Sequence, residues 1–159
     1  MTADIGPGND SVHITRIFRA PRAEVFGWWA SAEKLQQWSR CRDAVSCEVV
    51  MDFRVGGSFT QKMTIAIEGR NCQFTVTGVY EEIVVPERIT YRLGPGAPMT
   101  RVTVDFFDHA DGTRVELTHE GFVDGRACRA VQQGTGESLD ILESIVAARA
   151  AATSGAGAQ

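Results

Sequence analysis

The sequence has little of several features that mark whole classes of protein. It carries 16 Lys and Arg against 20 Asp and Glu, a formal net charge of −4. It therefore lacks the basic excess that neutralises phosphates, and we expect no nucleic-acid partner. No apolar run approaches the roughly 20 residues that span a bilayer, and residues 1–10 lack the basic start and apolar stretch of a secretory signal. We expect a soluble, cytoplasmic protein without a membrane partner.

Cysteine and histidine are few and scattered. The four cysteines form no C-x-x-C pair, and His13, His109 and His119 lie far apart. Zinc sites need such pairs or neighbouring histidines, so no metal or other cofactor is expected, and the thiols are predicted to be free. Neither G-x-S-x-G nor H-E-x-x-H occurs, so nucleophilic and zinc-dependent catalysis have no support in the sequence.

What is present is the composition of one globular domain. The 159 residues are 43% hydrophobic and 23% charged. A chain of this size buries about 70% of its unfolded surface, enough for one sizeable core. Residues 1–10 and 150–159 offer few apolar side chains to bury, so both are predicted to be disordered tails. A single domain is expected over residues 11–149.

The first part of the domain predicts one strand and two short helices. The strand is expected over residues 11–19. Pro21 suits a first helical position, because its missing N–H would be unpaired there in any case. Apolar residues then recur at helical spacing from Val25 to Trp29. Ser31 is predicted to cap a second short helix, with Trp38 facing inward.

From Val45 the apolar period changes from helical to two. The alternation continues to His119 and is interrupted by turn residues, among them Gly56-Gly57, residues 68–71 and the loop at 94–98. It predicts six consecutive antiparallel strands with one apolar face.

The last element expected is a long helix over residues 125–149 with an apolar stripe. Gly134 and Gly136 lie inside it and each costs about 1 kcal/mol relative to alanine, which favours a kink or break near Gly134. Only this helix is long enough to cover the apolar face of the strands. The sequence therefore predicts an α+β fold in which a curved antiparallel sheet of about seven strands wraps around a C-terminal helix.

Six stretches, taken in order, match a known family. They are Ile17–Phe26 (IFRAPRAEVF), Leu35–Trp38 (LQQW), Asp52–Phe59 (DFRVGGSF), Gly78–Arg88 (GVYEEIVVPER), Gly112–Phe122 (GTRVELTHEGF) and Ser138–Leu142 (SLDIL). On these residues the chain resembles the START-like, or SRPBCC, superfamily, and within it the bacterial homologues of the heat-shock-chaperone ATPase activator. The resemblance implies a helix-grip fold with a cavity between sheet and helix, which commonly accepts hydrophobic or aromatic molecules. Members range from ligand carriers to polyketide cyclases.

Two departures from the family pattern concern the junction of helix and sheet. Ser39 stands where the family usually has a second aromatic residue after the tryptophan matched by Trp38. Gly134-Thr135 stands where the family has Gly-Trp. The loss of two large side chains is expected to enlarge the cavity or to make it more polar.

His119 is the histidine whose strand parity points inward. We read it first as a neutral, hydrogen-bonded core residue; the alternative is a ligand contact or general base, because the ordinary pKa of histidine lies near 6.5. Gln61 and Tyr91 also face inward, and these three side chains could anchor a polar ligand end or bond one another or water. The side chains predicted to contact a ligand are Trp38, Phe59, Gln61, Met63, Phe74, Tyr91, Phe106, His119, Thr135 and Leu139.

The main hypothesis is a binding module for a small hydrophobic or aromatic molecule, without covalent chemistry. One alternative is a cyclase-like or hydrolase-like enzyme with His119 as its base. Another, which rests on family analogy alone, is partner binding in the manner of a chaperone ATPase activator. A homodimer through an exposed sheet edge is left open by the residues.

Overall fold

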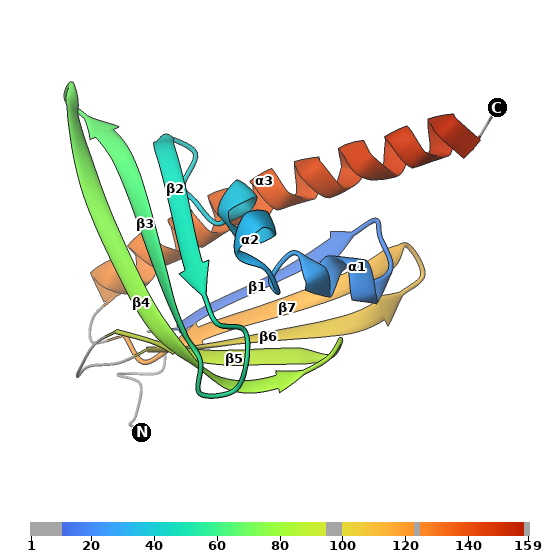
Figure 1. Cartoon of the computed structure of the whole chain (residues 1–159), viewed down its shortest axis with the longest axis horizontal. Coiled ribbons are helices and arrows are strands. Elements are labelled where there is room, and N and C mark those ends of the chain that lie inside the picture. Colours follow the sequence, from blue (N-terminus) through green and yellow to red (C-terminus); the bar gives the residue numbers. More distant parts are fainter. Residues whose placement is uncertain (1–10, 95–99, 123–124, 158–159) are drawn as a thin grey trace.

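The structure, a computed structural model, describes residues 11–94, 100–122 and 125–157. It confirms the predicted α+β class, with one curled antiparallel sheet against a long helix (Figure 1). In chain order the elements are β1 (Ser11–Phe18), α1 (Arg22–Gly27), α2 (Ala32–Trp38), β2 (Ala44–Met51), β3 (Ser58–Ile67), β4 (Arg70–Val84), β5 (Arg88–Leu93), β6 (Thr100–His109), β7 (Gly112–Glu120) and α3 (Gly125–Gly157).

The seven strands are ordered β1-β7-β6-β5-β4-β3-β2, and every neighbouring pair is antiparallel. The first strand therefore pairs with the last, and α1 and α2 carry the chain to the opposite edge at β2. Figure 1 shows β2, β3 and β4 rising steeply from the layer formed by β5, β6, β7 and β1. This curl gives the sheet a concave side, on which all three helices lie.

The predicted alternation is clearest in β7. Thr113, Val115, Leu117 and His119 are buried, whereas the residues between them are only partly buried. The same alternation buries Val102, Val104 and Phe106 in β6. One face of the sheet therefore meets the helices and the other meets water, as the sequence predicted.

The turns differ in detail from the prediction. The β3–β4 hairpin has two turn residues, Glu68 and Gly69, with φ of 51° and 79°. Positive φ at both central positions is typical of a type I′ turn, which matches the twist of the flanking strands. The loop predicted at residues 94–98 lies largely outside the described residues.

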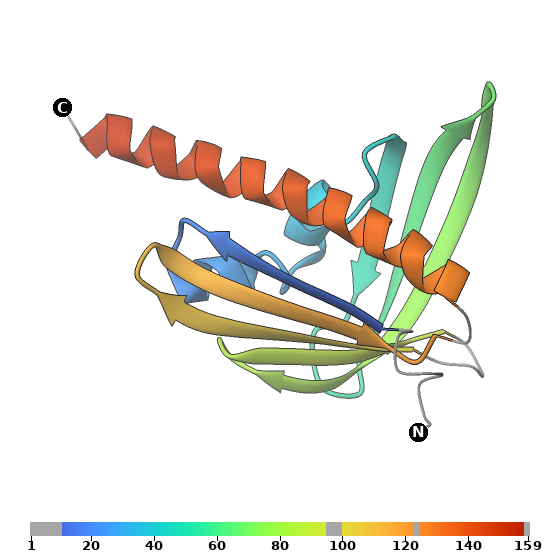
Figure 2. The same cartoon turned by 180° about the vertical axis from the view of Figure 1, so that it is seen from behind.

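The long helix α3 was predicted to end at Arg149 and to kink or break near Gly134. It has no break from Gly125 to Gly157, so the predicted break is wrong. Leu139, Leu142 and Val146 are each at most 1% exposed, and their burial outweighs the helix cost of the two glycines. Figures 1 and 2 show the C-terminal end of α3 extending beyond the sheet. Alanines favour helix, so the helix continues through residues that were assigned to a tail.

The predicted tail at residues 1–10, and residues 158–159 of the C-terminal one, lie outside the described residues, and the domain limits stay a prediction. None of the described helices is long and apolar enough to cross a membrane.

The core at the α1 end of the concave side is filled with aromatic rings. The Phe106 ring from β6 lies 5.0 Å from the Phe26 ring and 5.1 Å from the Trp29 ring, centroid to centroid. Phe18 meets Trp29 edge-on at 6.5 Å. Such tilted and edge-to-face pairs are favourable beyond their burial. This end of the space between sheet and helices is therefore closed.

Candidate functional site

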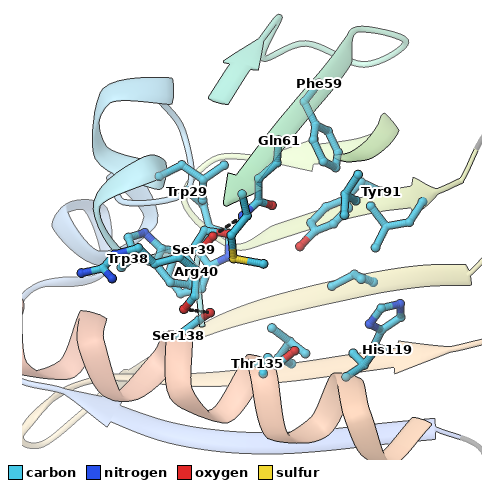
Figure 3. A pocket seen from close by; sticks show the side chains of 18 of the residues that line it. Trp29, Trp38, Ser39, Arg40, Phe59, Gln61, Tyr91, His119, Thr135 and Ser138 are labelled. Atoms are coloured by element: carbon cyan, nitrogen blue, oxygen red, sulfur yellow. Dashed lines mark hydrogen bonds between the residues drawn. The ribbon is translucent and has the colours of Figure 1, made fainter. Parts of the chain in front are cut away.

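The other end of the concave side holds a pocket of about 290 Å³. Its floor is the inner face of β3 to β7, and its walls are α2 with the residues after it and the N-terminal half of α3 (Figure 3). The pocket is lined by Trp29, Leu35, Trp38, Ser39, Arg40, Cys41, Phe59, Gln61, Met63, Val76, Tyr80, Ile89, Tyr91, Leu93, Val102, Leu117, His119, Val131, Gly134, Thr135 and Ser138.

Seven of the ten predicted contact residues line this pocket. They are Trp38, Phe59, Gln61, Met63, Tyr91, His119 and Thr135. Their position is a finding, whereas their role in binding a ligand stays a prediction.

The other three predicted residues lie elsewhere. Phe74 pairs with Met63 in the β3–β4 ladder, but its side chain is 46% exposed. Phe106 and Leu139 are each 1% exposed and belong to the filled core. Strand and helix parity placed all three on an inward face without showing which part of that face borders the pocket.

Several lining residues were left out of the predicted set. Tyr80, Val102 and Leu117 have the same inward strand parity as the predicted residues, so that signal was available. Ser138 follows Thr135 by three residues on α3, and helical spacing puts the two on one face.

Trp38 is held in place at the end of α2. The Ser31 hydroxyl accepts a hydrogen bond from the Lys34 amide at 3.2 Å, which confirms the predicted cap. The Trp38 indole Nε1 donates to the Trp28 carbonyl oxygen at 3.0 Å, and its ring meets Trp29 at 4.7 Å. Trp38 is therefore a fixed wall of the pocket.

Residues 39–41 are tied to both sides of the pocket. The Gln61 amide Nε2 on β3 donates to the Ser39 carbonyl oxygen. The Ser138 hydroxyl on α3 donates to the Arg40 carbonyl oxygen at 2.8 Å. These bonds connect β3 and α3 through residues 39 and 40. Ser39 and Thr135, which stand where the family pattern has larger side chains, present small polar groups to the pocket.

His119 has the features of the neutral core histidine, and it also lies at the pocket, where its role as a ligand contact stays a prediction. It is 6% exposed, and its Nε2 lies 2.8 Å from the Thr100 hydroxyl. Burial lowers its pKa to about 4, since desolvation penalises the charged imidazolium. The residue is thus a neutral, hydrogen-bonded histidine whose ring also borders the pocket.

Two tyrosines add hydroxyl groups to the pocket. Burial raises the pKa of both Tyr80 and Tyr91 well above the usual range, so both keep their protons at neutral pH. The Tyr80 hydroxyl lies 3.9 Å from the Met51 sulfur. The Tyr91 hydroxyl has no hydrogen-bond partner among the described residues, and Figure 3 shows it pointing into the pocket. Within the same described ranges, no three His, Cys, Asp or Glu side chains gather as a metal site.

A curled antiparallel sheet that packs around one long helix, α3, with two short helices after its first strand, is the arrangement of a helix-grip α+β protein. The chain belongs to the family described as Activator of Hsp90 ATPase homolog 1-like protein, whose model matches residues 19–147. This confirms the resemblance drawn from the six sequence stretches. No curated protein matches the chain significantly.

Solved structures agree with this family. A protein from Chromobacterium violaceum is 24% identical with a TM-score of 0.77, covering 86% of this chain and 96% of its own. An uncharacterised protein from Rhizobium leguminosarum is 31% identical with a TM-score of 0.67, covering 86% and 93%. The AHSA1 protein from Silicibacter pomeroyi is 20% identical with a TM-score of 0.74, covering 87% and 99%. The first and third of these likenesses show the fold alone.

Proposed function

We propose that the protein binds a small hydrophobic or aromatic molecule in this pocket without forming a covalent bond to it. The observation that carries the proposal is a space of about 290 Å³ lined mainly by apolar and aromatic side chains. Ligand sites are typically roughly 300–1,000 Å³, so this pocket is at the small end. An apolar cavity of about 150 Å³ can hold benzene. A molecule with one or two fused rings is therefore the expected size.

The family supports the same proposal. Proteins with this fold commonly bind hydrophobic ligands in the space between sheet and helix, and the matched residues 19–147 include both walls of the pocket. The tied segment at residues 39–41 keeps that space open before any ligand arrives. A largely preformed site avoids part of the ordering cost of binding.

A neutral fluorescent aromatic tests the proposal directly. 1-Naphthylamine, with two fused rings, is expected to bind one molecule per chain, with enhanced emission and quenching of tryptophan fluorescence. The variant Thr135→Trp places a large ring in the pocket, at the position where the family has tryptophan. It is expected to fold and to lose saturable binding.

The matched control is Gln132→Trp, which adds the same ring to an exposed position on α3. It is expected to bind as the wild type does. Failure of the wild-type chain to bind any of a panel of neutral aromatics rejects the proposal. So does undiminished binding by a folded Thr135→Trp variant.

The alternatives have less support. A general base works best with a pKa near the operating pH, whereas burial holds the pKa of His119 at about 4. Partner binding rests on the family description alone, and an ATPase assay with the chaperone tests it. We keep as predictions the cytoplasmic location and the lack of a nucleic-acid partner. A homodimer is compatible with the sequence and is not part of the proposal.

A further inference from the structure

The floor of the pocket carries a row of side chains in register across four strands. Tyr80 on β4 pairs with Tyr91 on β5, Tyr91 pairs with Val102 on β6, and Val102 pairs with His119 on β7. All four line the pocket. Neighbouring strands lie about 4.8 Å apart, so the Tyr91 and His119 backbones are roughly 10 Å apart. The residue between them in the row, Val102, has a short apolar side chain.

Most polar groups around this row already have partners. The Trp38 indole and the Ser138 hydroxyl each donate to a backbone carbonyl oxygen, and the His119 Nε2 lies 2.8 Å from the Thr100 hydroxyl. The Tyr91 hydroxyl has no acceptor among the described residues. That hydroxyl opens onto the pocket, so it can donate a hydrogen bond to an oxygen of a ligand bound there.

The same row disfavours a charged ligand. Burial keeps Tyr91 protonated and His119 neutral at pH 7, so neither supplies a cation for an anionic group. Arg40 also borders the pocket, but Figure 3 shows its guanidinium on the Trp38 side, turned away from Tyr91 and His119. A carboxylate placed over Val102 would be buried without a counter-ion, which is costly.

We propose that the pocket selects uncharged aromatic carbonyl compounds, with the ring over Val102 and the ketone or ester oxygen accepting a hydrogen bond from the Tyr91 hydroxyl. This inference rests on the proposed function and names the ligand class of that same site.

Three naphthalenes of similar size test it by calorimetry at pH 7.5: 2-acetylnaphthalene, 2-ethylnaphthalene and 2-naphthoate. For each protein the quantity measured is the ratio of its affinity for the ketone to its affinity for the hydrocarbon. The two ligands differ in hydration, but this difference is the same for every protein and cancels when the ratio of a variant is compared with that of the wild type. One hydrogen bond is worth about fivefold to tenfold in affinity. We expect Tyr91→Phe to lower the ratio by that factor and to leave 2-ethylnaphthalene binding within about twofold. The anionic 2-naphthoate should bind most weakly.

Two matched variants separate Tyr91 from its neighbours. Tyr80→Phe removes the hydroxyl that faces the Met51 sulfur, and Thr135→Val removes a lining hydroxyl from α3 on the opposite wall. Because both residues line the pocket, the affinity for every ligand can change, but the ratio of ketone to hydrocarbon affinity should keep its wild-type value. A ratio unchanged in Tyr91→Phe, or lowered instead in either control, overturns the assignment. Tightest binding of 2-naphthoate, weakened by Arg40→Gln, overturns the preference for uncharged ligands. In those cases the pocket still binds aromatics; if none of the three binds, the proposed function itself fails.

Discussion

Gly78 on β4 lies directly against the ring of its cross-strand partner Phe59 on β3. A Cβ atom at Gly78 would stand 2.5 Å from Cε2 and Cζ of that ring and 2.5 Å from the Arg92 carbonyl oxygen. The ring in turn packs 5.3 Å from the rings of Tyr80 and Tyr91. The missing side chain at Gly78 therefore lets Phe59 lie over β4 as part of the pocket floor.

We expect Gly78→Ala to lower the free energy of unfolding by about 1–3 kcal/mol, because the added methyl group must displace a ring and a backbone oxygen. The displaced Phe59 ring should also weaken binding of the naphthyl probe. Urea unfolding measures the first effect and a fluorescence titration the second.

Gly134→Ala is the control for that substitution. A Cβ at Gly134 meets no heavy atom within 4 Å, and alanine favours the helix interior by about 1 kcal/mol. This variant should be as stable as the wild type or more so. If Gly78→Ala unfolds at the wild-type urea concentration, the close approach to Phe59 is not what the glycine provides.

Ser31 caps the N-terminus of α2, the helix that carries two residues of the pocket wall. Ser31→Ala removes the acceptor of the Lys34 amide and should cost about 1 kcal/mol. Because α2 carries Leu35 and Trp38 to the pocket wall, probe binding should weaken as well. Ser31→Asp keeps an acceptor and adds a negative charge at the helix N-terminus, so it should retain stability. Equal destabilisation by alanine and aspartate would show that the hydroxyl does not act as a cap.

Sequence reasoning succeeded where one local rule decides the outcome. The period of two identified the inward faces of β3, β6 and β7, and the cap at Ser31 follows from a rule that involves four residues. The register row from Tyr80 to His119 could not be read from the sequence in this way. It depends on the pairing register of each strand with its neighbour, and turns and bulges determine that register.

The failures concern what surrounds a side chain and not the direction in which it points. Phe74 has the correct parity, yet it is exposed because the β3–β4 hairpin extends past the helices that cover the rest of the face. Phe106 and Leu139 face inward too, but the Phe26 ring of α1 and the Trp29 ring that follows this helix fill the space around Phe106. Parity states which way a side chain points; whether anything covers it depends on the relative lengths and angles of packed elements. The unbroken course of α3 past Gly134 likewise reflects burial of its apolar stripe, which composition does not show.

The Ser138 hydroxyl makes one of the hydrogen bonds between α3 and the segment after α2, beside those of Arg42 with Glu137 and Asp140. Ser138→Ala removes its 2.8 Å hydrogen bond to the Arg40 carbonyl oxygen and leaves that part-buried oxygen without this donor. We expect a loss of about 1 kcal/mol in unfolding free energy and weaker probe binding, because the Arg42 bonds to Glu137 and Asp140 then hold the wall to the helix without the bond at Arg40. Ser144→Ala makes the same change at an exposed position of α3 and should be neutral or slightly stabilising. The prediction fails if the two variants have the same stability and affinity.

The buried histidine gives the last prediction, a dependence of stability on pH. The folded-state pKa of His119 is about 4, below the unfolded value of 6.5, so the unfolded chain binds the extra proton first as pH falls. The contribution of His119 to stability is therefore complete above pH 6.5 and is lost progressively as the pH falls toward 4. Between pH 7.5 and pH 5 the loss from this one group should be about 2 kcal/mol.

Urea unfolding of the wild type and of His119→Gln at both pH values isolates this contribution. Acidic groups with depressed pKa values, such as Glu81 beside Arg101, weaken the fold of both proteins in acid and cancel in the comparison. Glutamine keeps a polar side chain near the Thr100 hydroxyl but does not titrate. The wild type should lose more stability than the variant on going to pH 5, by about 2 kcal/mol. An equal loss in the two proteins would mean that His119 takes up its proton as readily in the fold as in the unfolded chain, which is incompatible with the dry setting described for it.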